Sequence, residues 1–123
     1  MGVAMSFNVV VAGGRDFCDA RLIMVKLDKL FERVKDDVCI ISGGARGADR
    51  LGERYALSKG YPYIIMPADW DRYGKSAGYR RNQEMAERAS ACVVFWDGKS
   101  RGSKHMIDIC EERDIPLRVV RYD

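Results

Sequence analysis

The sequence contains a single histidine, and its four cysteines are scattered without a C-x-x-C pair. No Cys/His/Asp cluster has the spacing of metal ligands, which argues against a structural or catalytic zinc site. Cys39 and Cys92 lie inside apolar runs, where cysteine behaves as a small hydrophobic residue. We therefore expect no bound metal and reduced, mostly buried thiols. Cys18 is the expected exposed exception, because it follows a glycine turn.

Long hydrophobic runs are also missing. The longest apolar stretches span only a few residues and are broken by charges, so no segment is predicted to cross a membrane. The first residues have neither the basic start nor the long apolar centre of a signal peptide, and residues 1–6 are interpreted as a short leader before the fold. These features predict a cytoplasmic protein with no membrane partner.

The chain has little excess charge of either sign. Its 123 residues include 21 basic and 18 acidic side chains, which are interleaved and give a formal net charge of +3. A nucleic-acid-binding domain usually shows a stronger, one-sided basic excess. The composition disfavours nucleic acid as a partner but permits local phosphate recognition. With 47% of its residues hydrophobic, the chain can bury a sizeable core, so residues 1–123 are expected to form a single domain.

Two familiar nucleotide motifs are absent. Residues 74–76 and 98–100 both read G-K-S, like the end of a P-loop, but Asp69 and Val93 occupy the positions where that motif requires its first glycine. The dinucleotide fingerprint G-x-G-x-x-G does not follow the first apolar run either, which disfavours ordinary NAD or FAD binding. No certain cofactor is predicted.

Apolar runs and amphipathic segments alternate along the chain. Five runs are predicted as strands, at residues 7–12, 38–41, 61–66, 91–96 and 117–120. Helices are expected after Asp19 as N-cap, from about residue 46 to a C-cap at Gly60, from 77 or 78 to 89, and after residue 103. The alternation predicts an α/β fold, a three-layer Rossmann-like sandwich around a mostly parallel five-stranded sheet. We favour strand order 3-2-1-4-5 over 2-1-3-4-5.

A glycine-rich turn carries the clearest functional signal. The run at 38–41 ends at Ser42-Gly43-Gly44, and Gly47 follows in the first turn of the next expected helix. The first N–H groups of a helix have no intrahelical partner and lie at the positive end of its dipole, so this turn can hold an anion. Arg46 and the Ser42 hydroxyl would add donors. The alternative is that the glycines only make a tight turn and pack the helix on the strand.

Two further glycine loops follow the first and fourth strands. Residues 13–16 read G-G-R-D, and residues 97–103 read D-G-K-S-R-G-S. The carboxyl ends of parallel strands meet at one edge of a sheet, so the loops after strands one, two and four are expected to form one pocket.

The segment 67–76 is the longest predicted loop and presents Trp70 among charges. Trp70 is interpreted either as a stacking surface for a base or as a lid over the sheet. Arg81 and Asn82 fall in the first turn of the next helix, where a basic side chain opposes the dipole. A ligand phosphate or a neighbouring aspartate is expected to compensate the positive charge of Arg81. His105 lies in the first turn of the last helix, where we expect an exposed polar role, with ligand contact as the alternative.

Four motifs in order resemble the YspA/YpsA-like group of the SLOG superfamily, which joins DprA with the Lonely Guy phosphoribohydrolases. They are G-G-R-D-F, S-G-G-A-R-G-A-D-R-L, P-A-D-W-D-R-Y-G-K-S-A-G-Y-R-R-N and W-D-G-K-S-R-G-S. The resemblance covers nearly the whole chain and implies a Rossmann-like fold that binds a nucleotide or a nucleotide-derived ligand. With the residues already discussed, the expected ligand site comprises Gly13, Gly14, Arg15, Asp16, Ser42, Gly43, Gly44, Arg46, Gly47, Asp49, Trp70, Arg81, Asn82, Gly98, Gly102 and Ser103.

Enzymatic members similar to the Lonely Guy proteins cleave the N-glycosidic bond of a nucleoside monophosphate with an Arg and a Glu. Arg81 falls where the resemblance implies that Arg, but residues 104–106 read K-H-M where the Glu is expected. Glycosidic cleavage needs a carboxylate near its oxocarbenium-like state, and Asp97 or Asp108 would have to supply it. The missing Glu favours binding over catalysis.

Three functions therefore stay open. The first is a binding or sensing module for a nucleotide-like ligand, whose bound state is read by an effector protein or by self-association into a homo-oligomer. The alternative is an N-glycosidic hydrolase of nucleoside monophosphates that uses Arg81. The second alternative is single-stranded DNA binding by the basic loops, with Trp70 and Tyr73 as stacking platforms.

Overall fold

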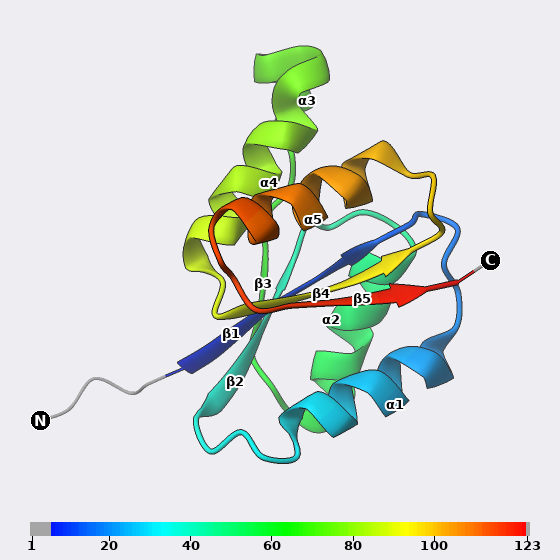
Figure 1. The fold of residues 1–123 in the computed structure, drawn as a ribbon, viewed down its shortest axis with the longest axis vertical. Coiled ribbons are helices and arrows are strands. Elements are labelled where there is room, and N and C mark those ends of the chain that lie inside the picture. The colour runs from blue at the N-terminus through cyan, green and yellow to red at the C-terminus, as the bar shows by residue number, and fades with distance from the viewer. Residues whose placement is uncertain (1–5, 123) are drawn as a thin grey trace, which may run out of the picture.

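The computed structural model describes residues 6–122, which alternate between strands and helices (Figure 1). The leader expected at the N-terminus lies outside the described residues as far as residue 5, and Ser6 already belongs to the first strand. In chain order the elements are β1 (Ser6–Gly13), α1 (Ala20–Phe31), β2 (Asp37–Ser42), α2 (Ala48–Lys59), β3 (Tyr63–Ile65), α3 (Trp70–Tyr73), the 3-10 helix η1 (Gly74–Ser76), α4 (Ala77–Arg88), β4 (Ala91–Trp96), α5 (Arg101–Glu112) and β5 (Leu117–Arg121).

The five strands form one parallel sheet in the order β3-β2-β1-β4-β5, so the favoured strand order is confirmed. β1 is the central strand, with Val9 opposite Ile40 of β2 and Gly13 opposite Phe95 of β4. β2 and β3 follow β1 on one side of the sheet, and the chain then crosses over to add β4 and β5 on the other side of β1. This reversal lies between β1 and β4, and crevices of open α/β sheets form beyond the carboxyl ends of such strands.

Helices cover both faces of the sheet, as a three-layer sandwich requires (Figure 1). Val9 and Val11 of β1 pack in the cluster that includes α1 and α2, whereas Val10 and Ala12 pack in the cluster that includes α4 and α5. Successive side chains of a strand point to opposite faces, so a strand covered on both sides must be apolar throughout. The buried residues 9–12, which read V-V-V-A, have this composition for that reason.

The helix ends follow local sequence signals closely. The Asp19 side chain accepts a hydrogen bond from Leu22 N over 2.9 Å as the N-cap of α1, and Gly60 caps α2 in the left-handed conformation with φ +75°. α2 begins at Ala48 instead of near Arg46, because Gly47 has φ +82° and cannot continue a right-handed helix backwards. The two predicted caps are confirmed, and the predicted start of α2 is wrong by about one half turn.

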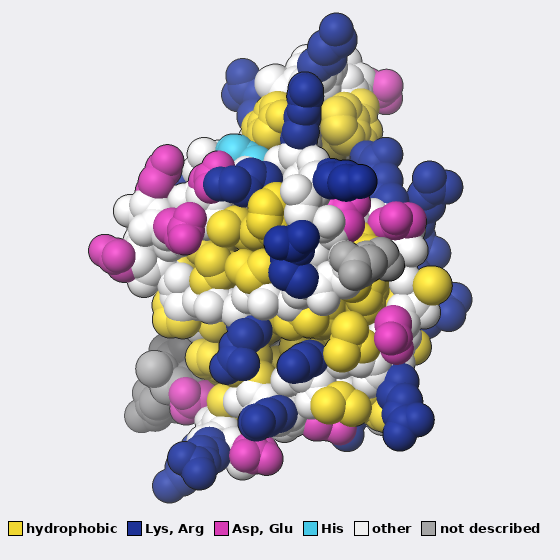
Figure 2. All heavy atoms as spheres, turned by 45° about the vertical axis from the view of Figure 1, so that its right-hand side comes forward, with side chains coloured by type: hydrophobic (Ala, Val, Ile, Leu, Met, Phe, Trp, Pro, Cys, Tyr) yellow, Lys and Arg dark blue, Asp and Glu magenta, His cyan; other side chains and the backbone are white. Residues whose placement is uncertain are grey.

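The segment predicted as a loop at 67–76 is mostly helical. The Asp69 side chain accepts from Arg72 N over 3.2 Å and caps α3, which η1 joins to α4. α3 and the start of α4 project beyond the sheet (Figure 1), and Figure 2 shows hydrophobic side chains at this tip beside Lys and Arg. Trp70 is 51% exposed there, so it does not act as a lid over the sheet.

The thiols lie as the sequence predicts, with Cys18 exposed and Cys39, Cys92 and Cys110 buried and free. Within residues 6–122, no helix has the length and apolar character needed to traverse a membrane.

Candidate functional site

Three glycine loops meet beyond the carboxyl ends of β1, β2 and β4. Backbone hydrogen bonds hold the β1 loop against its neighbours, because Gly14 N donates to Phe95 O of β4 over 3.1 Å and Ala48 N at the start of α2 donates to Gly14 O over 3.2 Å. A Cβ at Gly47 would overlap Gly14 O, and Gly47 also has a positive φ. Only glycine therefore allows the β2 loop to approach the β1 loop this closely. The convergence expected of these loops is present.

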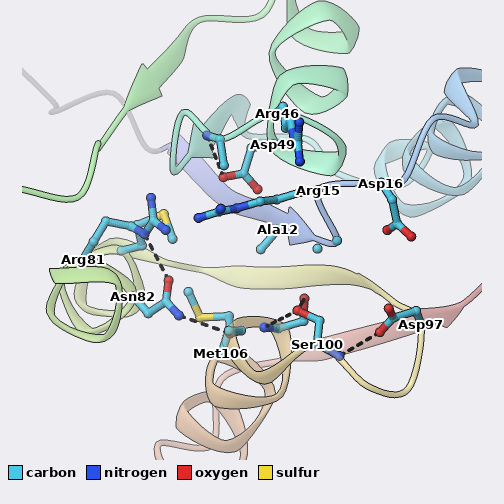
Figure 3. A pocket seen from close by; sticks show the side chains of 16 residues that line it. Ala12, Arg15, Asp16, Arg46, Asp49, Arg81, Asn82, Asp97, Ser100 and Met106 are labelled. Carbon is cyan, nitrogen blue, oxygen red and sulfur yellow. Dashed lines mark hydrogen bonds between the residues drawn. The ribbon is translucent and has the colours of Figure 1, made fainter. Parts of the chain in front are cut away.

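A cavity of about 410 Å³ opens between these loops, α4 and α5 (Figure 3). Its apolar lining comes from Ala12, Met85 and Met106. Its charged lining comes from Arg15, Asp16, Arg46, Asp49, Arg81 and Asp97, and the other lining residues are Gly13, Gly14, Ala45, Asn82, Ser100, Gly102 and Ser103. In Figure 3, Arg15 and Arg81 reach into the cavity from opposite ends. Most of the site residues expected from the sequence thus line one cavity.

An adjoining cavity, also of about 410 Å³, takes in three further expected residues. Gly43, Gly44 and Trp70 line it, together with Pro67 and Ala68. It shares Arg15, Ala45, Arg46 and Arg81 with the first cavity, so the two are parts of one cleft.

Ser42 differs from its expected role, because it lies behind the loop with no exposed surface. Its hydroxyl donates to Glu53 Oε2 over 2.6 Å and accepts from Gly44 N over 3.0 Å. Ala45 N likewise donates to Asp49 Oδ2 over 3.2 Å. Two amides of the turn are therefore already bonded to the chain's own side chains, and the positive charge of the cleft comes from its arginines.

Gly98 and Asp108 lie outside both cavities. They line a separate hollow with Trp96, Lys99 and Lys104, and Lys104 forms an ion pair with Asp108. Of the two carboxylates considered for catalysis, only Asp97 lines the same cavity as Arg81. Asp97 Oδ1 accepts from the amides of Ser100 and Lys99, each over 2.8 Å, and these bonds lower its pKa. Asp97 is therefore an ionised rim carboxylate at neutral pH.

Arg81 is fixed at the junction of α4 and the β2 loop. Its Nη1 donates to Gly43 O over 2.6 Å and its Nε donates to Asn82 Oδ1 over 3.1 Å. A Cβ at Gly43 would overlap this guanidinium, so the glycine gives Arg81 its place. Burial lowers the pKa of Arg81, which means that the cation is partly desolvated. Within residues 6–122, none of Arg15, Arg46 and Arg81 forms an ion pair.

Asp49 is the buried carboxyl of the cleft, with 5% of its surface exposed. Burial raises its pKa from 3.8 to about 6, although the Ala45 amide and the charges of Arg81 and Arg15 act in the opposite direction. Glu53, which is also buried, adds a smaller upward contribution. Near neutral pH this carboxyl is therefore close to taking up a proton.

Asn82 connects Arg81 to His105. Because a guanidinium only donates, the oxygen of the Asn82 amide must face Arg81, which leaves Asn82 Nδ2 to donate to Gly102 O over 3.3 Å and to His105 Nδ1 over 3.2 Å. His105 then accepts at Nδ1 and holds its proton at Nε2. Burial lowers the pKa of His105, which favours this neutral form. No local pattern predicts this contact, which joins residues 23 positions apart.

Comparison with known proteins supports the same family as the four motifs. A family model described as "YspA, cpYpsA-related SLOG family" matches residues 7–73. The chain belongs to this SLOG family. It is also 31% identical over 116 residues to the Gene 61 protein of Mycobacterium phage D29, a match that covers 89% of this chain and 93% of that protein. No solved structure matches the chain.

The SLOG match covers the loops after β1 and β2 but ends before Arg81. The family match therefore does not include the far side of the cleft, which α4 and the loop between β4 and α5 form. The assignment of that side to the site depends on the structure alone. Lining residues that sequence reasoning missed are Ala12, Ala45, Met85, Ser100 and Met106. Met85 and Met106 looked like ordinary core positions of their helices, and only the position of the cleft distinguishes them. Ala45 and Ser100 lie inside two of the quoted motifs, so the resemblance was the signal that could have identified them.

Proposed function

We propose that the cleft binds a nucleotide or nucleotide-derived ligand whose phosphate lies on Arg81, Arg15 and Arg46, and that the chain works as a binding or sensing module. The observation that carries the proposal is Arg81. This guanidinium is partly desolvated, held by two hydrogen bonds and without an ion-pair partner among residues 6–122. A desolvated cation gains more from an anion than a fully hydrated one does.

The rest of the cleft suits the other parts of such a ligand. Trp70 offers an exposed aromatic face beside Gly43 and Gly44, whereas Met85 and Met106 lie almost fully buried beneath the first cavity. Base stacking on an aromatic side chain contributes about 1–3 kcal/mol and tolerates any base. The SLOG resemblance, which implies a nucleotide-related ligand, supports the same interpretation.

Calorimetric titration with pyrophosphate, AMP and GMP tests the proposal. Arg81→Ala is expected to weaken binding by about 1.5–3 kcal/mol, the usual contribution of a hydrogen bond to a charged group. Arg46→Ala is expected to weaken it in the same direction. Arg54→Ala, on the exposed side of α2 away from the cleft, is the matched control. If Arg81→Ala and the parent chain bind these ligands with equal affinity, the phosphate does not bind at Arg81.

A hydrolase is the second candidate, and Asp49 is the observation that favours it. This carboxyl has a pKa of about 6 and lines the same cavity as Arg81, so it can change protonation state near neutral pH. Incubation with a panel of nucleoside monophosphates, with detection of free base, separates the two functions. Release of base that Asp49→Asn or Arg81→Ala abolishes would establish the hydrolase, whereas binding without release would support the sensing module.

A further inference from the structure

The two edge strands of the sheet differ in charge. β5 carries the exposed residues Arg118 and Arg121, and charged side chains on an edge strand oppose pairing with another chain. β3, at the other edge, reads Tyr63-Ile64-Ile65, and residues 61–68 contain no charged side chain although 32% of the whole chain is charged. The three side chains of β3 are 36%, 38% and 47% exposed in chain order. β3 is therefore an exposed, hydrophobic edge without the charges that protect β5.

The backbone of β3 is also open on its outer side. The carbonyl of Pro62 accepts a hydrogen bond from β2 over 3.0 Å, and the amide of Met66 donates one to β2 over 2.7 Å. Polar backbone groups alternate in direction along a strand, so those of Ile64 face β2 as well, whereas those of Tyr63 and Ile65 point away from it. No other strand of residues 6–122 pairs with this side. The N–H and C=O groups of two residues are thus available to a further strand.

Hydrophobic side chains flank this backbone on both faces of the sheet. Ile64 is paired with a residue of β2 that packs in the cluster including α4, so Tyr63 and Ile65 lie on the opposite face, which α2 covers. Leu57 extends the surface on the α2 face, because it lies on the opposite flank of α2 from Tyr55, whose hydroxyl binds α1. Leu57 is 65% exposed. A strand added to β3 would therefore cover exposed hydrophobic side chains on both faces.

We infer that β3 pairs with β3 of a second copy of this chain, antiparallel about a twofold axis at Ile64. The absence of charge favours a second copy as the occupant. A twofold interface brings a surface against itself, so a charged edge would oppose like charges, and residues 61–68 oppose none. The same pairing at β5 would bring arginines together.

The register follows from the directions of the backbone groups. Tyr63 of one copy lies opposite Ile65 of the other, and each such pair exchanges both of its N–H···O=C hydrogen bonds. Ile64 lies opposite Ile64 of the second copy in the non-hydrogen-bonded pair between them, where side chains are closest. The two sheets become one continuous sheet across the dimer. This inference goes beyond the proposed function and needs no ligand.

Sedimentation velocity of the parent chain between about 1 and 300 µM tests the inference, because dimerisation depends on concentration. The parent is expected to change from the mass of one chain to that of two as its concentration rises. Ile64→Lys and Ile64→Glu each place like charges opposite one another and should each weaken the dimer about tenfold or more. An equimolar mixture of these two variants should recover most of the lost affinity, because Lys then faces Glu.

Val119→Lys and Val119→Glu are the matched controls, because Val119 is 37% exposed on the opposite edge strand. Neither control should change self-association. Circular dichroism and the midpoint of urea unfolding should be the same for all four variants as for the parent, since each replaced side chain is exposed.

Three results would overturn the inference. A parent chain that stays monomeric over the whole range excludes a second copy at β3 and leaves this edge to a strand of a different protein. A dimer that the Ile64 variants do not weaken, or that the Val119 variants weaken equally, forms through another surface. Monomeric Ile64 variants whose mixture does not associate would refute the antiparallel register at Ile64. Binding of pyrophosphate or nucleotides is measured separately, so failure of the dimer would leave the proposed function standing.

Discussion

Replacing Asp49 by Asn should stabilise the protein at neutral pH, and the gain should disappear in acid. The Asp49 carboxyl is buried at the start of α2 and accepts a hydrogen bond from Ala45 N. The Asn side chain has nearly the same shape and keeps an oxygen for that amide, but it carries no charge. The substitution therefore isolates the cost of burying a carboxylate in the wall of the cleft.

The size of the effect follows from the pKa. Burial raises it from 3.8 to about 6, a difference that corresponds to about 3 kcal/mol. Between these two values the folded chain holds more protons at Asp49 than the unfolded chain does, so the stability of the parent falls as pH rises through this window. The difference in unfolding free energy between Asp49→Asn and the parent should grow by about 2–3 kcal/mol from pH 3.5 to 7.5.

Urea denaturation of both chains across this pH range measures the difference, and titrations common to both cancel. Asp97→Asn is the control, because backbone hydrogen bonds lower the pKa of Asp97. A lowered pKa contributes stability that is present above pH 3.8 and fades only as pH falls below it, so this variant should show almost no pH-dependent difference from the parent across the range. A difference between Asp49→Asn and the parent that stays constant with pH would refute a raised pKa at Asp49.

Four further outcomes are expected. Gly47→Ala should lower the unfolding free energy by more than about 2 kcal/mol, because a Cβ there meets backbone at a positive φ, whereas Gly102→Ala should change it by less than about 1 kcal/mol. Long-range ¹H–¹⁵N spectra should show His105, the single histidine, with its proton on Nε2 and a pKa below 6.5; a proton on Nδ1 would contradict the contact with Asn82. Ser42→Ala should cost about 1–3 kcal/mol of stability by leaving Glu53 without its donor, and binding of pyrophosphate by the folded variant should be unchanged. Sulfate, whose charge is constant in this range, should bind the parent more weakly as pH rises through about 6, and Asp49→Asn should remove that dependence.

The fold could be predicted because it depends on patterns that are local in the sequence. Apolar runs separated by amphipathic segments specify strands and helices, and capping residues such as Asp19 and Gly60 specify where helices begin or end. The strand order followed from the loops, because three glycine turns after strands one, two and four suit central strands with a common crevice. The missed helix α3 had a local signal as well, since Asp69 is a capping residue, but its short length and polar surroundings resembled a loop.

The candidate site was predictable by position and much less so by contact. Loop residues such as Arg15 and Gly102 could be assigned from the edge of the sheet on which they lie. The partner of a polar side chain, however, depends on distances between segments far apart in the chain. Arg81 donates a hydrogen bond to Gly43 O across 38 residues. The Ser42 hydroxyl donates to Glu53 on α2 and does not face the cleft. A small rotation of a side chain or a small shift of a helix is enough to change such a hydrogen-bond partner, and the periodicity of the sequence does not specify either.

The charges of the cleft explain why a turn rich in glycine is combined with a buried acid. Asp49 occupies the Ala45 amide that an incoming anion would otherwise use, and it places a carboxyl beside Arg81 and Arg15. When the cleft is empty, this carboxyl partly compensates the arginines and limits their mutual repulsion. The negative charge of the proposed phosphate would raise the pKa of Asp49 further, so the proposed binding should be accompanied by uptake of a proton. The affinity of the proposed site for an anion should therefore fall as pH rises through about 6.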